Sequence, residues 1–434
     1  MTHRFRLLLA LVVLLLLVAA ACGQKSGVAG QQVSAGGGNG APSNGTGTTT
    51  AGKPAAHEPD ENDKVGVTDT EIVIGVHAPV TGASPVPQNS FDTGKDIYWK
   101  FLAESAPDKL FGRTVRVVFR DDKFNPQEAV RVCREMVEEE KAFLLVGGGG
   151  ADQITACAKY ADEAGVPYLS AGVNEAGLAD LSTYYATTLS YPAQAPLIID
   201  LIKEKNFTKV GFVTADTPSF KDAHDAFVKA AEDADLDIVV DTPINKTANA
   251  TEALTVVQEL KSADAEVVVL LSSPTVYVTG LAAGARSQSY EPTWVGPGVT
   301  SGLNAVLTFG CPSVEKGEFF SPFPGLDVVD ELDPDYTPAY PEYGGGAEAD
   351  DIGLALWALN KALALMFEAT GEDLGRAAFM NTIESTDEFA NGVYPPIRIT
   401  PEDHFGGTGA HLLDADCASD PKQYKTTKQF VEVG

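Results

Sequence analysis

The stretch FLLVGGGGADQITACAKYADEAGVPYLSAG, residues 143–172, decides the fold class. The apolar run Phe143–Gly147 enters a series of glycines, an amphipathic pattern follows over Asp152–Ala164, and a second apolar run occupies Tyr168–Ser170. Short apolar runs bounded by turn residues indicate buried strands, and the longer pattern between them indicates a helix. This order predicts a right-handed βαβ unit with two parallel strands.

The same alternation continues on both sides of this unit. Further strands are predicted at Glu71–His77, Thr114–Arg120, Lys209–Thr214, Asp237–Pro243, Val267–Ser272 and Pro292–Gly296, with antiparallel strands in the tail from Ile397. Helices are predicted at Phe91–Glu104, Pro126–Glu139, Pro192–Glu204, Ser219–Ala234, Ala250–Ser262, Thr275–Ser287, Ile352–Thr370 and Leu374–Ser385. Alternation of this kind predicts an α/β fold with parallel sheets. The chain from Val67 onward is too long for one such core, so we expect two Rossmann-like, doubly wound lobes.

Segments rich in proline and aromatic residues predict where the chain passes between the lobes. The first boundary is expected near Ser190–Pro192, and later crossings near Phe319–Pro324 and Tyr394–Pro396. Repeated crossings suit hinge closure around a ligand. We therefore expect one lobe of residues 67–190 plus 321–393 and another of residues 191–320 plus 394–434.

The N-terminus has the pattern of a lipoprotein export signal. Two arginines precede the apolar run Leu7–Val18, and small residues then lead to Cys22. This order predicts cleavage after residue 21, lipid on Cys22 and a protein anchored to the membrane outside the cytoplasm. Residues 22–66 are rich in Gly, Ser, Thr, Ala and Pro and predict a flexible tether. Plain secretion is the alternative, because Ala19 occupies the position where such signals usually carry leucine.

Four further cysteines, in an exported chain, suggest two disulfides. Cys133 and Cys157 fall in successive predicted helices with one strand between them, so we expect the pairs Cys133–Cys157 and Cys311–Cys417, although four cysteines allow three pairings. A metal site is disfavoured because the chain has no CxxC motif with nearby histidines.

Charge excludes one class of partner. The chain has 60 acidic and 31 basic residues, which leaves no basic surface for nucleic-acid phosphates. The acidic residues are scattered along the sequence and are expected to serve solubility.

Residues Gly148 to Asp152 and Gly172 to Asn174 follow neighbouring predicted strands and are here called the glycine seat. Ligands of α/β sheets bind beyond the carboxyl ends of the strands. Glycines allow close approach of the backbone, and a helix N-terminus offers unpaired N–H groups and a positive dipole end. The seat is therefore predicted to bind a carboxylate or another hydrogen-bonding head group. The alternative is a tight turn in which Asp152 is an N-cap. A dinucleotide fingerprint is disfavoured because Asp152 occupies the place of its third glycine.

Four motifs resemble one known family. They are VTDTEIVIGVHAPVTG (67–82), DDKFNPQEAV (121–130), GVPYLSAG (165–172) and WVGPGV (294–299). They resemble the leucine/isoleucine/valine-binding proteins, the type I periplasmic binding proteins of branched-chain amino acid ABC transporters, over Val67 to Val433. The resemblance implies a hinge of three strands, a small-molecule solute in the cleft, delivery to a membrane permease, a monomer without a cofactor, and no catalysis.

The family's ligand contacts transfer only in part. Its carboxylate-binding positions fall at Gly150, Ala151 and Asp152 and at Gly172, Val173 and Asn174. Its aromatic contact from the second lobe falls at Phe220, or one residue earlier at Ser219. The acid that receives a ligand ammonium falls at Gly298, which carries no charge. A buried ammonium needs an anionic partner. Either Asp152, Asp216 or Glu175 supplies that charge, or the ligand lacks an α-amino group.

Two other functions were weighed against solute delivery. A receptor with the same clamp could signal to a membrane partner instead of a permease. An extracellular hydrolase is less favoured, because the scattered histidines form no triad pattern and Gly-x-Ser-x-Gly is absent.

Overall fold

The computed structural model describes residues 56–171 and 175–433. The predicted signal, Cys22 and most of the predicted tether lie outside the described residues, as do Gly172, Val173 and Asn174 of the glycine seat.

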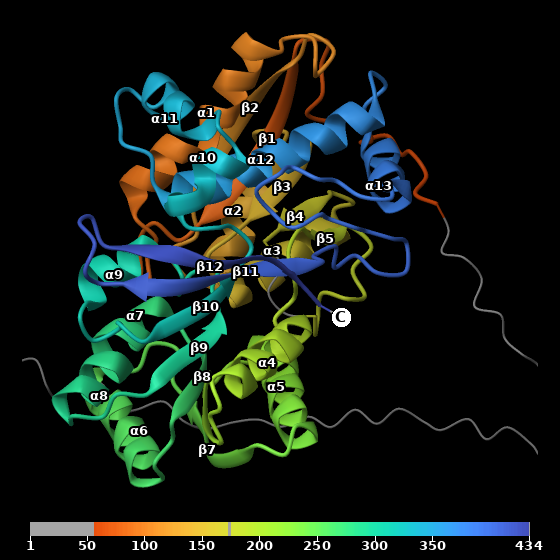
Figure 1. Cartoon of the computed structure of the whole chain (residues 1–434). Coiled ribbons are helices and arrows are strands. Elements are labelled where there is room, and N and C mark those ends of the chain that lie inside the picture. The colour runs from red at the N-terminus through yellow and green to blue at the C-terminus, as the bar shows by residue number, and fades with distance from the viewer. Residues whose placement is uncertain (1–55, 172–174, 434) are drawn as a thin grey trace, which may run out of the picture. The chain divides into compact units, whose positions relative to one another are not determined.

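Within these residues, the first sheet has five parallel strands in the order β2-β1-β3-β4-β5 (Figure 1). Its strands are β1 (Glu71–Ala78), β2 (Thr114–Asp121), β3 (Leu144–Gly147), β4 (Tyr168–Ser170) and β5 (Tyr184–Ala186). The interior strand β1 places Ile74 opposite Val117 of β2 and Leu144 of β3. The strand order changes direction beside β1, and ligands of such sheets bind at this switch point.

Alternate residues of β1 face two different layers of helices. Ile72 and Ile74 pack in one core, whereas Val73 packs in another. The first layer contains α1 (Gln88–Ser105), α12 (Asp351–Thr370) and α13 (Arg376–Ser385), and the second contains α2 (Pro126–Glu138) and α3 (Ala151–Glu163). Because both faces are covered, the strand is apolar throughout its centre.

Among the described helices, one is long and apolar enough to cross a membrane, judged by length and composition alone. This helix is α12. Its Trp357, Leu363 and Phe367 are instead buried in the core beside α1. These contacts identify α12 as a core helix of the fold.

The second sheet has, in the described chain, seven strands in the order β12-β11-β10-β9-β8-β6-β7. Its parallel strands are β6 (Lys209–Ala215), β7 (Asp237–Ile244), β8 (Val267–Leu271), β9 (Thr293–Pro297) and β10 (Gly317–Ser321). The antiparallel strands β11 (Gly409–Asp416) and β12 (Gln423–Glu432) extend it beyond β10.

Helices also cover both faces of the second sheet (Figure 1). One face carries η1 (Pro192–Gln194), α4 (Ala195–Glu204), η2 (Pro218–Phe220) and α5 (Lys221–Asp233). The other carries α6 (Ala250–Ser262), α7 (Pro274–Val276), η3 (Tyr277–Ala282), α8 (Ala283–Ser287) and α9 (Asn304–Gly310). The elements η4 (Leu326–Val328), α10 (Val329–Leu332) and α11 (Tyr336–Tyr343) lead toward α12. The predicted fold class, two doubly wound parallel sheets with an antiparallel tail, is confirmed. The short strands β5 and β10 were not predicted.

Both predicted disulfides are present. Cys133 of α2 is bonded to Cys157 of α3, with 6.0 Å between the Cα atoms, and Cys311 after α9 is bonded to Cys417 after β11. The first pair joins neighbouring helices on one face of the sheet, as their order in the sequence indicated. His77 lies near the first pair, with ligand atoms of the three residues within 4.8 Å of one another. Because the two sulfurs are bonded to each other, they offer no thiolate to a metal.

The segment before β11 lies at the last predicted crossing between the lobes. Val393, Tyr394 and Ile397 pack in the core of the first sheet, whereas β11 pairs with the second sheet from Gly409. The bounds of the two lobes stay a prediction.

Candidate functional site

A cavity of about 60 Å³ lies where loops from both sheets meet. It is here called the head-group cavity. The loops that follow the carboxyl ends of strands supply most of its lining: Phe124 after β2, Gly148–Asp152 after β3, Ala171 after β4, Thr217 and Phe220 after β6, Lys246 after β7, Ser272–Pro274 after β8, and Val299 and Thr300 after β9. Both sheets thus present the end at which α/β proteins bind ligands.

The glycine loop is held close to its neighbours on several sides. Gly149 has a φ of +94°, and a Cβ there would lie 2.7 Å from Cδ of Pro79. A Cβ on Gly147 would lie 1.6 Å from the hydroxyl of Tyr168. Side chains are therefore excluded at these positions, and the backbone itself forms this wall of the cavity.

The start of α3 offers hydrogen-bond donors to the cavity. Gly150 is the N-cap and has no side chain to accept from the first N–H groups of the helix. Gln153, which is 1% exposed and lines the cavity, has no hydrogen-bond partner for its Nε2 among the described residues. The buried Oγ of Ser272, on the opposite wall, likewise lacks one in the described chain. Buried polar atoms are normally satisfied, so these groups are suited to a bound polar ligand.

Asp152 joins the first sheet's side of the cavity to the second. Its carboxylate accepts a hydrogen bond of 2.6 Å from Thr217 Oγ1 and forms an ion pair with Lys246. Burial alone would raise the pKa of Asp152, but hydrogen bonds from Lys246, Thr217 and Ser219 lower it below its ordinary value. Asp152 is therefore ionised and already paired.

The other two acids that could receive a ligand ammonium are Asp216 and Glu175, and neither is a free acid in the cavity. Asp216 is exposed and does not line the cavity. The side chain of Glu175 accepts a hydrogen bond from Ser190 Oγ, and its backbone N–H donates to Asp222 of α5 over 2.7 Å. Among the described lining residues, Asp152 is the single acid, and Lys246 neutralises it.

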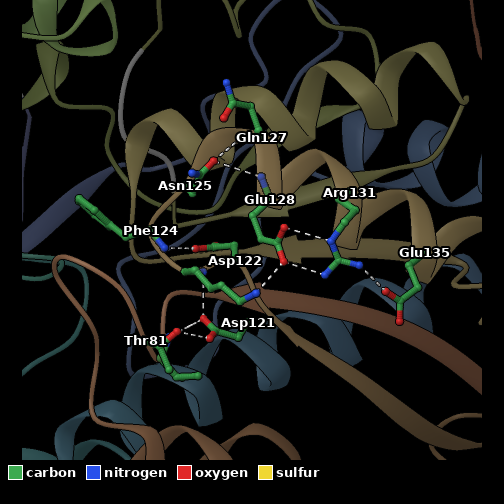
Figure 2. Close-up of polar contacts among 11 residues, drawn as sticks. Thr81, Asp121, Asp122, Phe124, Asn125, Gln127, Glu128, Arg131 and Glu135 are labelled. Atoms are coloured by element: carbon green, nitrogen blue, oxygen red, sulfur yellow. Dashed lines mark hydrogen bonds and ion pairs between the residues drawn. The ribbon is translucent and has the colours of Figure 1, made fainter. Parts of the chain in front are cut away.

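Figure 2 shows a network of polar contacts in the second βα loop, which contains Phe124. Phe124 lines the head-group cavity. Asp122 accepts from the N–H of Phe124 over 3.0 Å, and Phe124 itself has a φ of 55°. Asn125 then caps α2 by accepting from the N–H groups of Gln127 and Glu128. The ring of Phe124 lies 5.9 Å from Lys246 Nζ, close enough for a cation–π contact.

Beneath the glycine loop lies a fully buried polar group. His77 Nδ1 is 2.8 Å from Asp122, and its Nε2 is 2.7 Å from the hydroxyl of Tyr168. Both ring nitrogens are thus engaged within the protein. His77 supports the loops around the cavity and has no free nitrogen for acid–base chemistry.

The structure brings part of the predicted site together. Gly148, Gly149, Gly150, Ala151, Asp152 and Phe220 all line the head-group cavity. Gly298 does not, because its backbone packs against β10, where a Cβ would lie 2.8 Å from the carbonyl oxygen of Phe320. Its neighbours Val299 and Thr300 line the cavity instead.

The residues missed from the sequence come mainly from the second sheet. They are Phe124, Gln153, Ile154, Ala171, Tyr191, Ala215, Thr217, Lys246, Ser272, Ser273, Pro274, Val299 and Thr300. Most of those in the second sheet follow the carboxyl end of a strand, so the rule used to find the glycine loop would also have found them if applied to the strands after residue 208.

Comparison with known proteins gives one family match and several similar folds. Residues 71–420 match the periplasmic binding protein family. A stretch of 121 residues is 30% identical to an amino acid binding protein of Pseudomonas aeruginosa, covering 26% of this chain and 30% of that relative's length.

Solved structures share the fold at low sequence identity. A possible leucine/isoleucine/valine-binding protein from Rhodopirellula baltica is 15% identical with a TM-score of 0.72, covering 82% of this chain and 96% of that chain. A fatty acid ABC transporter substrate-binding protein from Thermomonospora curvata is 18% identical with a TM-score of 0.70, covering 85% and 94%. A solute-binding protein from Rhodopseudomonas palustris, in complex with 3,4-dihydroxybenzoic acid, is 16% identical with a TM-score of 0.70, covering 84% and 98%.

Proposed function

Because the chain belongs to the periplasmic binding protein family, we propose that it closes around a small solute outside the cytoplasm and delivers it to an ABC permease. The single observation that carries this proposal is the head-group cavity, where strand ends from both sheets converge on one small space. Hinge closure around such a space is how two-lobed receptors hold a ligand.

The chemistry of the cavity favours an anionic or strongly hydrogen-bonding head group. The backbone N–H groups at the start of α3, the Gln153 amide and the Ser272 hydroxyl offer donors. Helix N-termini stabilise negative charge, and charged hydrogen bonds are stronger than neutral ones. A carboxylate or an amide fits this arrangement.

Among the described residues that line the head-group cavity, no free acid is available to pair with a ligand ammonium. Asp152 is paired with Lys246, and the position that usually carries the acid is Gly298. Burying an ammonium without a counter-charge is costly. We therefore propose a solute that lacks an α-amino group, with weak or absent binding of leucine, isoleucine and valine.

The receptor is further proposed to be a lipid-anchored monomer. Cys22 would carry the anchor, and the segment that follows it would allow the folded part to reach the permease. The predicted end of this flexible segment at residue 66 is too late, because His57 and Asp63 already hydrogen-bond to residues of α13. Two acyl chains give stable anchoring where one binds only marginally.

Two titrations test the head-group assignment. Residues Lys53–Gly434 form one compact unit with both sheets and both disulfides, so this part of the chain is used. Isothermal titration with benzoate and with leucine is compared for the wild type and Asp152→Ala. Asp233→Ala, which removes an exposed acid from α5, is the control. We expect benzoate binding to survive or tighten in Asp152→Ala, because Lys246 is then left unpaired.

The opposite result is equally clear. Micromolar leucine binding that collapses in Asp152→Ala, but not in Asp233→Ala, would show that the carboxylate of Asp152 holds an ammonium. The polarity proposed for the glycine seat would then be reversed.

A further inference from the structure

A second, larger cavity adjoins the head-group cavity. It has a volume of about 510 Å³ and is here called the apolar cavity. The larger apolar side chains of its lining are Val80, Val86, Val278, Leu303, Val306 and Phe309. The other lining residues are Pro, Gly, Ala, Ser, Thr and Gln, so none of its described lining residues is ionisable. In a chain with 60 acidic residues, this wall is conspicuously free of charge.

The two cavities adjoin each other. Gly149, Pro274 and Thr300 line both, so the glycine loop lies at the boundary between them. A smaller apolar space of about 100 Å³ also borders Gly149 and Thr300. A molecule held by its head group at the start of α3 would therefore extend directly into apolar surroundings.

The sizes of the two cavities suit two different parts of a ligand. A cavity needs roughly 10–15 Å³ per water molecule, so the head-group cavity has room for about four to six waters. That space suits a carboxylate but not a large body. The apolar cavity falls within the roughly 300–1,000 Å³ typical of sites for drug-sized ligands.

The edge of the apolar cavity carries an unusually exposed aromatic ring. Phe309 of α9 is 81% exposed, whereas Val306, one turn earlier, is 4% exposed. A single exposed phenylalanine is unremarkable on its own. At the edge of an uncharged cavity, however, it offers apolar surface to a ligand that reaches outward.

We infer that the solute is an amphipathic carboxylate, with its head group in the head-group cavity and an apolar chain in the apolar cavity. This inference rests on the proposed solute-binding function and specifies its substrate class. The chain gains affinity by leaving water for the uncharged wall, and the head group fixes its direction.

A homologous series tests the inference. The chain Lys53–Gly434 is titrated calorimetrically with butanoate, octanoate and dodecanoate, each below its micellar concentration. Affinity is expected to rise with chain length, by up to about fourfold for each methylene buried. Equal affinity for all three acids would overturn the apolar-chain inference and leave the proposed function standing.

A matched pair of variants locates the chain. Ala305→Trp fills the apolar cavity from α9, and Thr308→Trp places the same ring on the exposed side of that helix. Ala305→Trp is expected to weaken dodecanoate binding at least tenfold and leave butanoate unchanged, whereas Thr308→Trp changes neither. Thr279→Trp, at an exposed lining position, replaces Ala305→Trp if that variant does not fold.

Two further outcomes separate the inference from the function. Unchanged dodecanoate binding in both Ala305→Trp and Thr279→Trp would show that the chain lies elsewhere. Binding of an amino acid with no binding of any carboxylate would overturn both the apolar-chain inference and the proposed head group.

Discussion

Asp152, in the first turn of α3, forms an ion pair with Lys246, which follows β7 of the second sheet. The pair joins the two sheets' loops across the head-group cavity, and the adjacent hydrogen bond from Thr217 joins them again. Lys246 thus neutralises the acid at the start of α3 and connects loops of the two sheets across the cavity.

Replacing Lys246 should weaken both the fold and anion binding. In Lys246→Gln, Asp152 keeps its burial but loses its counter-charge, so the cavity becomes negative. We expect benzoate affinity to fall at least tenfold and stability to fall by roughly 1–2 kcal/mol, because the pair is partly buried. Calorimetry and urea unfolding measure the two effects. Lys229→Gln, from an exposed pair on α5, should change neither; equal losses in both variants would contradict a specific role for Lys246.

Two adjacent glycines provide a test of the glycine loop. Gly149→Ala forces a side chain into a φ of +94° and against Pro79, whereas a Cβ on Gly148 meets nothing within 4 Å. We expect Gly149→Ala to lower the free energy of unfolding by roughly 1–3 kcal/mol. Gly148→Ala should stay within about 0.5 kcal/mol of the wild type. Urea unfolding compares the two, and equal stabilities would mean that the loop accommodates a side chain at either position.

The disulfides should stabilise the fold unequally. The Cys311–Cys417 pair spans 106 residues and the Cys133–Cys157 pair spans 24. Chain-entropy arguments give roughly 4–5 kcal/mol for the longer loop and about 3 kcal/mol for the shorter. Paired Cys→Ala variants, unfolded in urea, should therefore rank in that order. The reverse ranking would indicate that native-state packing of the buried Cys133–Cys157 pair outweighs loop entropy.

The sequence predicted those features that depend on local pattern. The alternation predicts a strand at Glu71–His77, and β1 forms there, with Ile72 and Val73 packed against different helix layers. The pair Cys133–Cys157 is predicted because the two cysteines fall in successive helices with one strand between them, and α2 and α3 carry this disulfide.

Features that depend on how distant loops meet could not be predicted in the same way. Asp152 and Lys246 are 94 residues apart, and nothing local to either residue indicates the other. Phe124 faces the cavity because of its left-handed backbone, which the motif alone did not reveal. The resemblance predicts Gly298 as a ligand-binding position. Its backbone packs against β10, however, and the following residues line the cavity instead.

A separate prediction concerns membrane anchoring through Cys22, which lies outside the described part of the chain. Cys22→Ala removes the thiol that receives lipid, so the protein should be released from the membrane or keep its signal uncleaved. Fractionation and the mass of the mature chain measure the outcome. Normal cleavage with unchanged membrane retention would contradict the lipoprotein assignment.

His411 should make stability depend on pH. It lies fully buried in β11, where Nε2 donates to the carbonyl of Val393 over 2.9 Å and Nδ1 has no partner among the described residues. Burial lowers the pKa of His411 to about 4, against about 6.5 in the unfolded chain, and the bond to Val393 opposes the shift only in part. Between these values the unfolded chain binds the extra proton, so stability falls as pH falls from 6.5 to 4.

The two pKa values of His411, in the folded and in the unfolded chain, give the size of its effect on stability. A shift of this size corresponds to about 3 kcal/mol once the pH is below 4. Asp351, whose burial raises its pKa to about 7, acts in the opposite sense, because its stabilising proton is lost as pH rises. The measurement is therefore the difference in urea stability between the wild type and His411→Gln at pH 7 and at pH 4.5. The variant loses packing at pH 7 but should lose less stability on acidification. An identical loss in both proteins would show that His411 is protonated in the fold.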